Sequence, residues 1–91
     1  MNLSYSLALE TRDLMSLSQV PEGARVWLRS LPLHPELQRR LLAMGIRPGV
    51  EIEVLRRGKP GGLLHLSSGL MEFMLRGEQA AEMEVTLIPP G

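Results

Sequence analysis

Apolar and polar residues alternate in short stretches over most of the chain, and turn residues separate these stretches. Such alternation is typical of β-strands that bury one face. The alternating stretches are residues 24–29, 50–55, 63–66, 70–75 and 83–87. Short strands joined by turns that contain Gly or Pro favour a small barrel, because closure removes exposed strand edges. The pattern therefore predicts a mostly β fold, namely a small five-stranded β-barrel.

One segment, residues 35–44, follows the period of a helix instead. Leu37, Leu41 and Met44 recur at positions i, i+4 and i+7 and form one apolar stripe. Pro35 suits the first helical position, where its missing N–H is not needed for a hydrogen bond. A short α-helix with a single apolar stripe has the right size to cap one open end of the barrel.

The residues that follow this segment predict a sharp helix ending. Gly45 stands where a residue of left-handed conformation often closes a helix. Ile46 is then placed to contact Leu41, which is the contact that accompanies a Schellman ending. Pro48 prevents the helix from restarting, and the next alternating stretch begins at Val50.

Length and composition indicate one small domain with a modest core, because the chain has 91 residues. We expect an N-terminal arm at residues 1–12, the domain at residues 13–88 and a tail at residues 89–91. Leu14 and Leu17 are spaced for one short helical turn. The sequence shows neither a signal peptide nor an apolar run of the ~18 residues that a membrane span needs. We therefore expect a cytoplasmic protein.

The composition argues against several classes of function. Ten Lys and Arg residues balance ten Asp and Glu residues, and cysteine is absent, which excludes disulfides and thiolate chemistry. The only aromatic residues are Tyr5, Trp27 and Phe73. Nucleic-acid binders usually carry a basic excess, and the recognition of single-stranded RNA or of proline-rich peptides uses aromatic surfaces. We therefore expect no nucleic-acid partner.

The sequence holds no recognisable catalytic constellation. His34 and His65 are the only good general bases, and neither has a Ser or Asp at a suggestive spacing. The Gly-rich segment 58–62 lacks the Gly-Lys-Ser/Thr ending and the following helix of a phosphate-binding loop. We therefore expect that the protein is not an enzyme.

Several polar residues are expected on the outward face of neighbouring strands. They include Glu51, and the candidate metal ligands among them are His65, Glu53 and Glu72. One imidazole with two or three carboxylates could hold Fe²⁺, Mn²⁺ or Zn²⁺ weakly. The alternative is an ordinary solvated face. We expect no cofactor, with a weakly bound transition-metal ion as the alternative.

The same outward face carries more apolar side chains than a monomer needs. These candidate partner-binding residues are Leu55, Leu63, Leu70 and Met74. A contiguous apolar patch often marks an interface, either with a second copy or with another protein. The alternatives are that the predicted register is shifted by one residue, or that the arm at residues 1–12 covers the patch.

A second candidate contact is the basic stretch that leads into the Gly-rich turn. Arg56, Arg57 and Lys59 are expected to lie at a flexible hairpin tip. These cations could contact an acidic protein surface or anionic lipid. The alternative is a solvated hairpin without a partner.

The stretches "LQRRLLAMGIRPGVEIEVLRRGKPGG" and "MLRGEQAAEMEV" resemble the FeoA domain family over roughly residues 13–88. The resemblance implies an SH3-like barrel. The motif positions are Arg40, Leu41, Met44, Gly45, Ile46, Pro48, Gly49, Val50, Ile52, Val54, Gly61, Gly62, Leu75, Arg76, Ala80, Met83 and Val85. Two positions depart from the family pattern: Gly77 replaces a frequent basic residue, and Leu63 replaces a frequent proline. The first departure weakens the case for a basic pair at Arg76 that binds a partner.

The resemblance also implies a function. Stand-alone FeoA proteins accompany ferrous iron uptake in bacteria, as small cytoplasmic accessories of FeoB, a membrane transporter with a GTPase domain. The same domain ends some iron-dependent repressors, but no helix-turn-helix pattern is present here. We therefore expect a regulator that binds a FeoB-type transporter at the inner face of the membrane and that can form homo-oligomers. A metal-responsive or metal-binding protein is the alternative.

Overall fold

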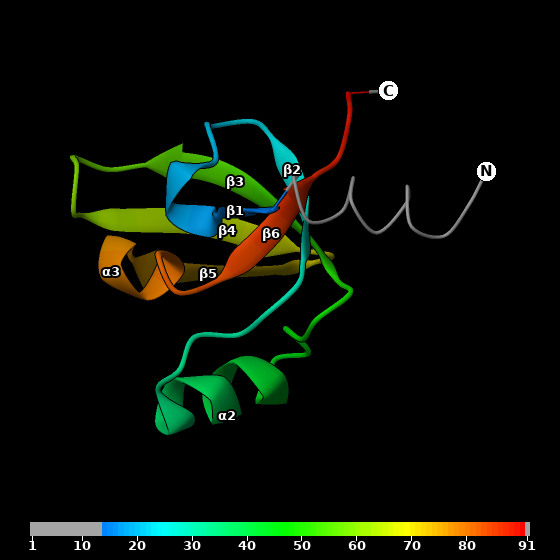
Figure 1. Ribbon diagram of the computed structural model, residues 1–91, viewed down its shortest axis with the longest axis vertical. Helices are drawn as coiled ribbons and strands as arrows, with labels where there is room; N and C mark the ends of the chain where they lie inside the picture. Colours follow the sequence, from blue (N-terminus) through cyan, green and yellow to red (C-terminus); the bar gives the residue numbers. More distant parts are fainter. Residues whose placement is uncertain (1–13, 91) are drawn as a thin grey trace.

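The computed structural model describes residues 14–90, which form one six-stranded antiparallel sheet and three short helical segments (Figure 1). The elements are β1 (Leu14–Ser16), the 3-10 helix η1 (Leu17–Gln19), β2 (Arg25–Leu28), α2 (Pro35–Ala43), β3 (Glu51–Arg57), β4 (Leu63–Ser68), β5 (Met71–Arg76), α3 (Gly77–Ala80) and β6 (Glu84–Leu87). The order across the sheet is β1-β6-β2-β3-β4-β5. The mostly β fold and the capping helix confirm what the sequence indicated. The proposed arm at residues 1–12 lies outside the described residues.

The sheet has one strand more than the alternation predicts. Leu14 lies in β1 opposite Thr86 of β6, and Leu17 begins η1, so the expected helical turn joining them is wrong. The N–H of Leu17 donates to the carbonyl of Met83 at 2.9 Å, and this bond continues the line of pairing between β1 and β6. A strand of three residues is too short to show alternation, which explains why the pattern did not reveal it.

The sheet does not close by hydrogen bonds between its first and last strands. In the described part of the chain β1 and β5 are the two edges of the sheet. The short helix α3 lies between them, where it packs against β4 and β5 on one side and η1 on the other. The expectation that closure removes the strand edges is therefore wrong for β5.

The core forms where the alternating stretches predict it. The buried apolar residues are Leu17, Val20, Val26, Leu28, Leu37, Leu41, Ile46, Ile52, Val54, Leu64, Leu66, Phe73, Leu75, Ala80, Met83 and Val85. Met71 and Leu87 continue the alternation of the buried residues on β5 and β6 but are 41% and 47% exposed. Met71 is the first residue of β5 and Leu87 is the last residue of β6.

Helix α2 lies at one end of the sheet and contributes Leu37 and Leu41 to the core (Figure 1). Its ending confirms the Schellman prediction. The N–H of Ile46 donates to the carbonyl of Leu41 at 2.8 Å, and the N–H of Gly45 donates to the carbonyl of Leu42 at 3.0 Å. Gly45 has φ +80°, the left-handed conformation that glycine adopts without strain.

The turn after the helix returns the chain to the sheet. The N–H of Val50 donates to the carbonyl of Arg47 at 3.2 Å across Pro48 and Gly49, and Gly49 has φ +102°. This is the pattern of a type II turn, with Pro at the second position and Gly at the third. The N–H of Gly49 also donates to the carbonyl of Leu28 at 2.7 Å, which fixes the start of β3 beside β2.

Candidate functional site

The outer face of strands β3, β4 and β5 gathers most of the candidate functional residues. The strand register sets them in rows. Glu53 lies opposite Ser67, and Ser67 lies opposite Glu72. One row closer to the hairpin between β3 and β4, Arg56, His65 and Met74 lie side by side, and Leu63 and Arg76 form the next row.

A bulge in β3 decides which residues share this face. Val54 pairs with Leu66 and Arg56 pairs with His65, so Leu55 has no cross-strand partner of its own. Simple alternation would turn Arg56 inward, whereas the extra residue brings it onto the outer face beside His65. Leu55 is half-buried at the bulge. The alternating pattern carries no signal for such an insertion.

Beside the bulge, charged and apolar side chains of two neighbouring rows form one surface. We call Arg56, Leu63, His65 and Met74 the hairpin patch. Leu63 is 48% exposed and Met74 is 53% exposed, so two large apolar side chains lie beside an arginine on the surface. Two hollows of about 290 and 350 Å³ adjoin Leu63 under the hairpin loop.

Leu70, the remaining apolar candidate, does not join the hairpin patch. It is fully exposed in the tight turn between β4 and β5, at the opposite end of these strands from Leu63. The four apolar residues proposed as one patch are therefore split. The structure brings Leu63 and Met74 together, places Leu55 nearby at the bulge, and leaves Leu70 apart.

The three cations near this hairpin differ in their surroundings. Arg56 and Arg57 belong to strand β3, so placing them at a flexible hairpin tip is wrong. The guanidinium of Arg57 donates to the carbonyl of Val20 at 2.7 Å, and its backbone N–H donates to the carboxylate of Glu22 at 2.9 Å. Only Lys59 lies in the loop itself, where it lines the smaller hollow.

The loop is held against α3 by glycines. The N–H of Gly77 donates to the carbonyl of Gly62 at 2.8 Å, and a Cβ on Gly77 would come within 3.3 Å of that oxygen. A Cβ on Gly62 would lie 2.9 Å from the carbonyl oxygen of Lys59. Side chains at positions 62 and 77 would therefore crowd the backbone where the loop meets α3. Arg76 precedes this contact, and its N–H donates to Oε1 of Gln79 at 2.9 Å.

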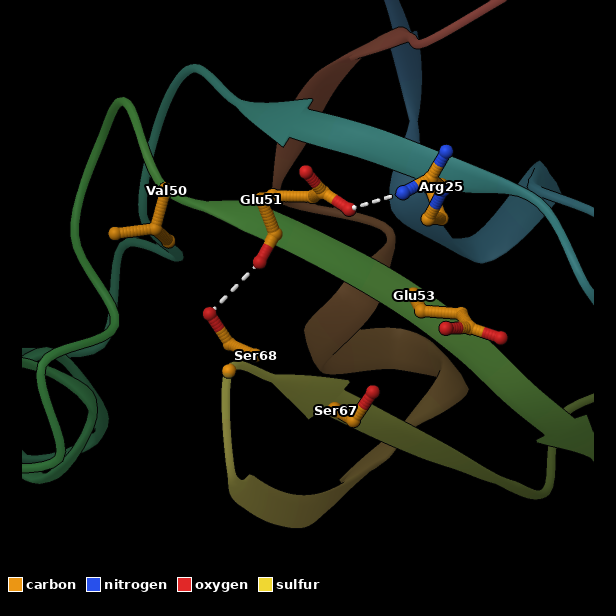
Figure 2. A pocket seen from close by; sticks show the side chains of 7 residues that line it. Arg25, Val50, Glu51, Glu53, Ser67 and Ser68 are labelled. Carbon is orange, nitrogen blue, oxygen red and sulfur yellow. Dashed lines mark hydrogen bonds and ion pairs between the residues drawn. The ribbon is translucent and has the colours of Figure 1, made fainter. Parts of the chain in front are cut away.

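The other end of the outer face is acidic (Figure 2). A groove of about 470 Å³ runs across β2, β3 and the end of β4, and the alternating pattern does not indicate it. Its lining residues are Arg25, Val50, Glu51, Glu53, Ser67, Ser68 and Gly69. The guanidinium of Arg25 donates to the carboxylate of Glu51 at 3.0 Å, and the hydroxyl of Ser68 donates to the carbonyl of Glu51 at 2.7 Å.

The candidate metal ligands are brought only partly together. Nε2 of His65 lies 2.8 Å from a carboxylate oxygen of Glu72, on the exposed face. Glu53 lies on the far side of Ser67 from Glu72. Over residues 14–90, no three His, Cys, Asp or Glu side chains form a group that could hold a metal ion. The other histidine, His34, caps α2, since its Nδ1 accepts the N–H of Leu37 at 3.3 Å.

Comparisons with known proteins agree on the fold and on the family. The model of the FeoA domain matches residues 15–87. A FeoA protein from Chlorobium tepidum, solved by NMR, has 27% identity and a TM-score of 0.77, over 82% of this chain and 71% of that one. No curated protein matches the chain. No helix within residues 14–90 is long and apolar enough to cross a membrane.

Two further solved structures resemble this chain to different degrees. Stenotrophomonas maltophilia FeoA complexed with zinc, described as a prokaryotic SH3 domain protein, has 29% identity and a TM-score of 0.65, over 78% of this chain and 88% of that one. A manganese-dependent transcriptional repressor shares the fold alone, with 17% identity and a TM-score of 0.73, over 82% of this chain and 42% of that one. The SH3-like fold is thus confirmed, and the chain belongs to the FeoA domain family, which is associated with ferrous iron transport.

Proposed function

We propose that this chain is a small, non-catalytic accessory protein of bacterial ferrous iron uptake that binds the cytoplasmic part of a FeoB-type transporter by protein contacts. The process is supported by the family and by the description of the S. maltophilia relative, which refers to ferrous iron transport. The observation that supports a docking function is the hairpin patch. It is the point on the outer face where exposed apolar side chains and cations lie together.

The chemistry of the hairpin patch suits a protein partner. Leu63 and Met74 present apolar surface that water covers poorly, and methionine adapts to partners of different shape. Arg56 lies on one side of the patch and Arg76 on the other, so the complementary surface is apolar at its centre and acidic at its rim. Long-range attraction to acidic groups speeds the encounter, and Leu63 with Met74 then supplies the contact area.

Leu63 and Leu70 are exposed leucines at opposite ends of the hairpin formed by β4 and β5, which allows a paired test of this site. Leu63→Glu places a carboxylate at the centre of the hairpin patch, and Leu70→Glu makes the same change on an exposed leucine at the opposite strand end. Binding to the purified cytoplasmic part of the cognate transporter is measured by biolayer interferometry, with and without guanine nucleotide and ferrous iron. We expect Leu63→Glu to weaken binding at least about tenfold, which corresponds to about 1.4 kcal/mol.

The control variant Leu70→Glu should bind like the wild type. Circular dichroism and urea unfolding check that both variants remain folded. Unchanged binding by Leu63→Glu, or an equal loss in both variants, would place the docking site elsewhere. No binding by the wild-type chain under any of these conditions would count against the function itself.

We propose weak binding of a transition-metal ion as a second candidate function. The observation that favours it is the 2.8 Å contact between His65 and Glu72, which pairs an imidazole with a carboxylate at the surface. The zinc named for the S. maltophilia relative adds support. Zinc and manganese titrations followed by calorimetry test it, with His65→Ala as the variant that should abolish the heat signal. An identical titration curve for the variant would reject these ligands.

A further inference from the structure

Strand β5 is an edge of the sheet, and the short helix α3 that follows it packs against it. The strand spans six residues, Met71–Arg76, and no described strand pairs with it on the side away from β4. Natural edges are commonly blunted by Lys, Pro or a bulge. The sequence of β5 has neither residue, and its pairing with β4 runs without interruption from Ser68 to Leu63. Figure 1 shows β5 beyond β4 at this side of the sheet.

The hairpin before β5 determines which backbone groups reach this edge. Ser68 and Met71 are paired across the two-residue turn of Gly69 and Leu70, and Gly69 has φ +61°. In such a hairpin the closing pair exchanges its hydrogen bonds, and bonded pairs then recur at every second residue. The N–H and C=O groups of the residues between them therefore face the open side. These residues are Glu72, Met74 and Arg76.

One hydrogen bond of the structure agrees with this assignment. The N–H of Arg76 donates to Oε1 of Gln79 at 2.9 Å, so it points away from β4. The N–H and C=O groups of Met74 and Glu72 are left facing the open edge. An approaching strand could exchange hydrogen bonds with Met74 and Glu72 there, whereas at Arg76 it would have to displace the bond to Gln79.

We propose that β5 pairs with β5 of a second copy of this chain, antiparallel and centred on Met74. Only the edge-facing residues can exchange hydrogen bonds between the two copies. The two-fold axis must therefore pass beside one residue of β5, and each choice of that central residue gives a different register. Centring on Met74 places Glu72 opposite Arg76 of the second copy, twice by symmetry. Centring on Phe73 would place Glu72 opposite Met74, and centring on Leu75 would place Met74 opposite Arg76. The charges of the strand therefore select the Met74 register.

The side chains in question are free to make these contacts. The side chain of Arg76 is 71% exposed, and its only ion-pair contact within residues 14–90 is with Glu78 at 4.0 Å. Glu72 is 63% exposed and keeps a second oxygen beyond its contact with His65. Met74 would meet its own copy on the two-fold axis, and both hairpin patches would then lie on one continuous outer face. A single-strand interface is small, so the dimer forms weakly and depends on concentration and salt.

Charge reversal tests this register, because the two halves of each ion pair come from different copies. Glu72→Arg alone and Arg76→Glu alone set like charges opposite each other. A mixture of the two variants restores both pairs, since each variant then meets the opposite charge. Sedimentation velocity over a concentration series measures the mass against the 10.1 kDa of one chain. Glu53→Arg, two strands inside the edge, is the control.

We expect the wild-type chain and the control to approach twice the monomer mass at high concentration, each single variant to remain near one mass, and the mixture to dimerise again. A monomeric wild type, dimerisation of the single variants, or a monomeric mixture would each overturn the proposal. No transporter is present in this experiment, and Leu63 takes no part in it. Its failure is therefore distinguishable from failure of the proposed function.

The absence of cysteine allows a direct test of the two-fold axis. Met74→Cys places one thiol per chain where the two copies meet, within the Cα separation of about 4.4–6.8 Å that a disulfide needs. Leu70→Cys places a more exposed thiol away from the axis. Under mild oxidation, we expect a disulfide-linked dimer of Met74→Cys to form several times faster than that of Leu70→Cys. Equal rates would overturn the register.

Discussion

The conformation of Gly45 gives a prediction whose energetic origin is isolated from other effects. Gly45 has φ +80°, and a Cβ built on it would meet no atom within 4 Å. Replacing it with alanine therefore causes no clash, and the whole cost comes from the left-handed backbone conformation. That cost is about 1–2 kcal/mol for a residue with a Cβ. Gly45→Ala should lower the free energy of unfolding by this amount.

Asparagine separates this cause from a general effect of adding a side chain. It tolerates the left-handed region better than alanine, so Gly45→Asn should recover part of the loss. Urea unfolding followed by circular dichroism measures both variants. With a slope of about 1–1.5 kcal/mol per molar urea, the midpoint of Gly45→Ala should fall by about 1 M at unchanged slope. A neutral alanine variant, or an asparagine variant that is less stable than alanine, would refute the reasoning.

The remaining stability predictions concern three other kinds of contact. Leu41→Ala removes a side chain that is 1% exposed where α2 meets the core, and thermal and urea unfolding should show a loss of about 2–5 kcal/mol. Gly62→Ala should destabilise the hairpin loop, because its Cβ would lie 2.9 Å from the carbonyl oxygen of Lys59, and backbone hydrogen exchange should quicken at the N–H of Gly77. Glu51→Gln breaks the exposed 3.0 Å pair with Arg25 and should change the stability by less than about 0.5 kcal/mol in the same urea assay.

Much of the fold follows from local signals in the sequence. Alternation located five strands, because burial of one face imposes a period of two. Pro35 and Gly45 marked the two ends of the helix, because each fits a backbone position that few other residues suit. The signals fail where an element is too short or where two elements meet. Strand β1 has three residues, and its pairing with β6 depends on contacts far along the chain.

The candidate site was less predictable, because it depends on register. Alternation correctly put Leu63, His65 and Met74 on one face, since they lie on two strands joined by a two-residue turn. The bulge at Leu55 shifted the relation of β3 to its neighbour, and nothing in the local sequence marks it. Leu70 lies in a turn, which likewise separates it from Met74, although the alternation puts both residues on the same face. Neutral net charge gave no hint that the outer face is acidic near Glu53 and basic near the hairpin.

Arg56 and Arg57 are adjacent and chemically identical, yet the structure gives them different surroundings. Arg56 points outward beside His65 in the hairpin patch, whereas Arg57 donates to the carbonyl of Val20 and ties β3 to the segment before β2. Arg57→Gln should therefore lower the free energy of unfolding by about 1–2 kcal/mol, because it loses a hydrogen bond from a charged donor. Arg56→Gln should leave the stability within about 0.5 kcal/mol of the wild type.

For binding to the transporter, we expect the larger effect from Arg56→Gln and the smaller one from Arg57→Gln. Arg56→Gln should weaken binding several-fold at low salt, and the difference from the wild type should shrink as salt is raised, because screening removes the contribution of an exposed charge. Arg57→Gln, measured where it is fully folded, should bind like the wild type at every salt concentration. Urea unfolding and biolayer interferometry on the same two proteins provide both comparisons. If the two variants change stability and binding in parallel, the bulge does not separate these neighbours and the hairpin patch is not the docking surface. If the effects separate as expected, one extra residue in β3 accounts for placing one arginine on the binding face while its neighbour holds the fold.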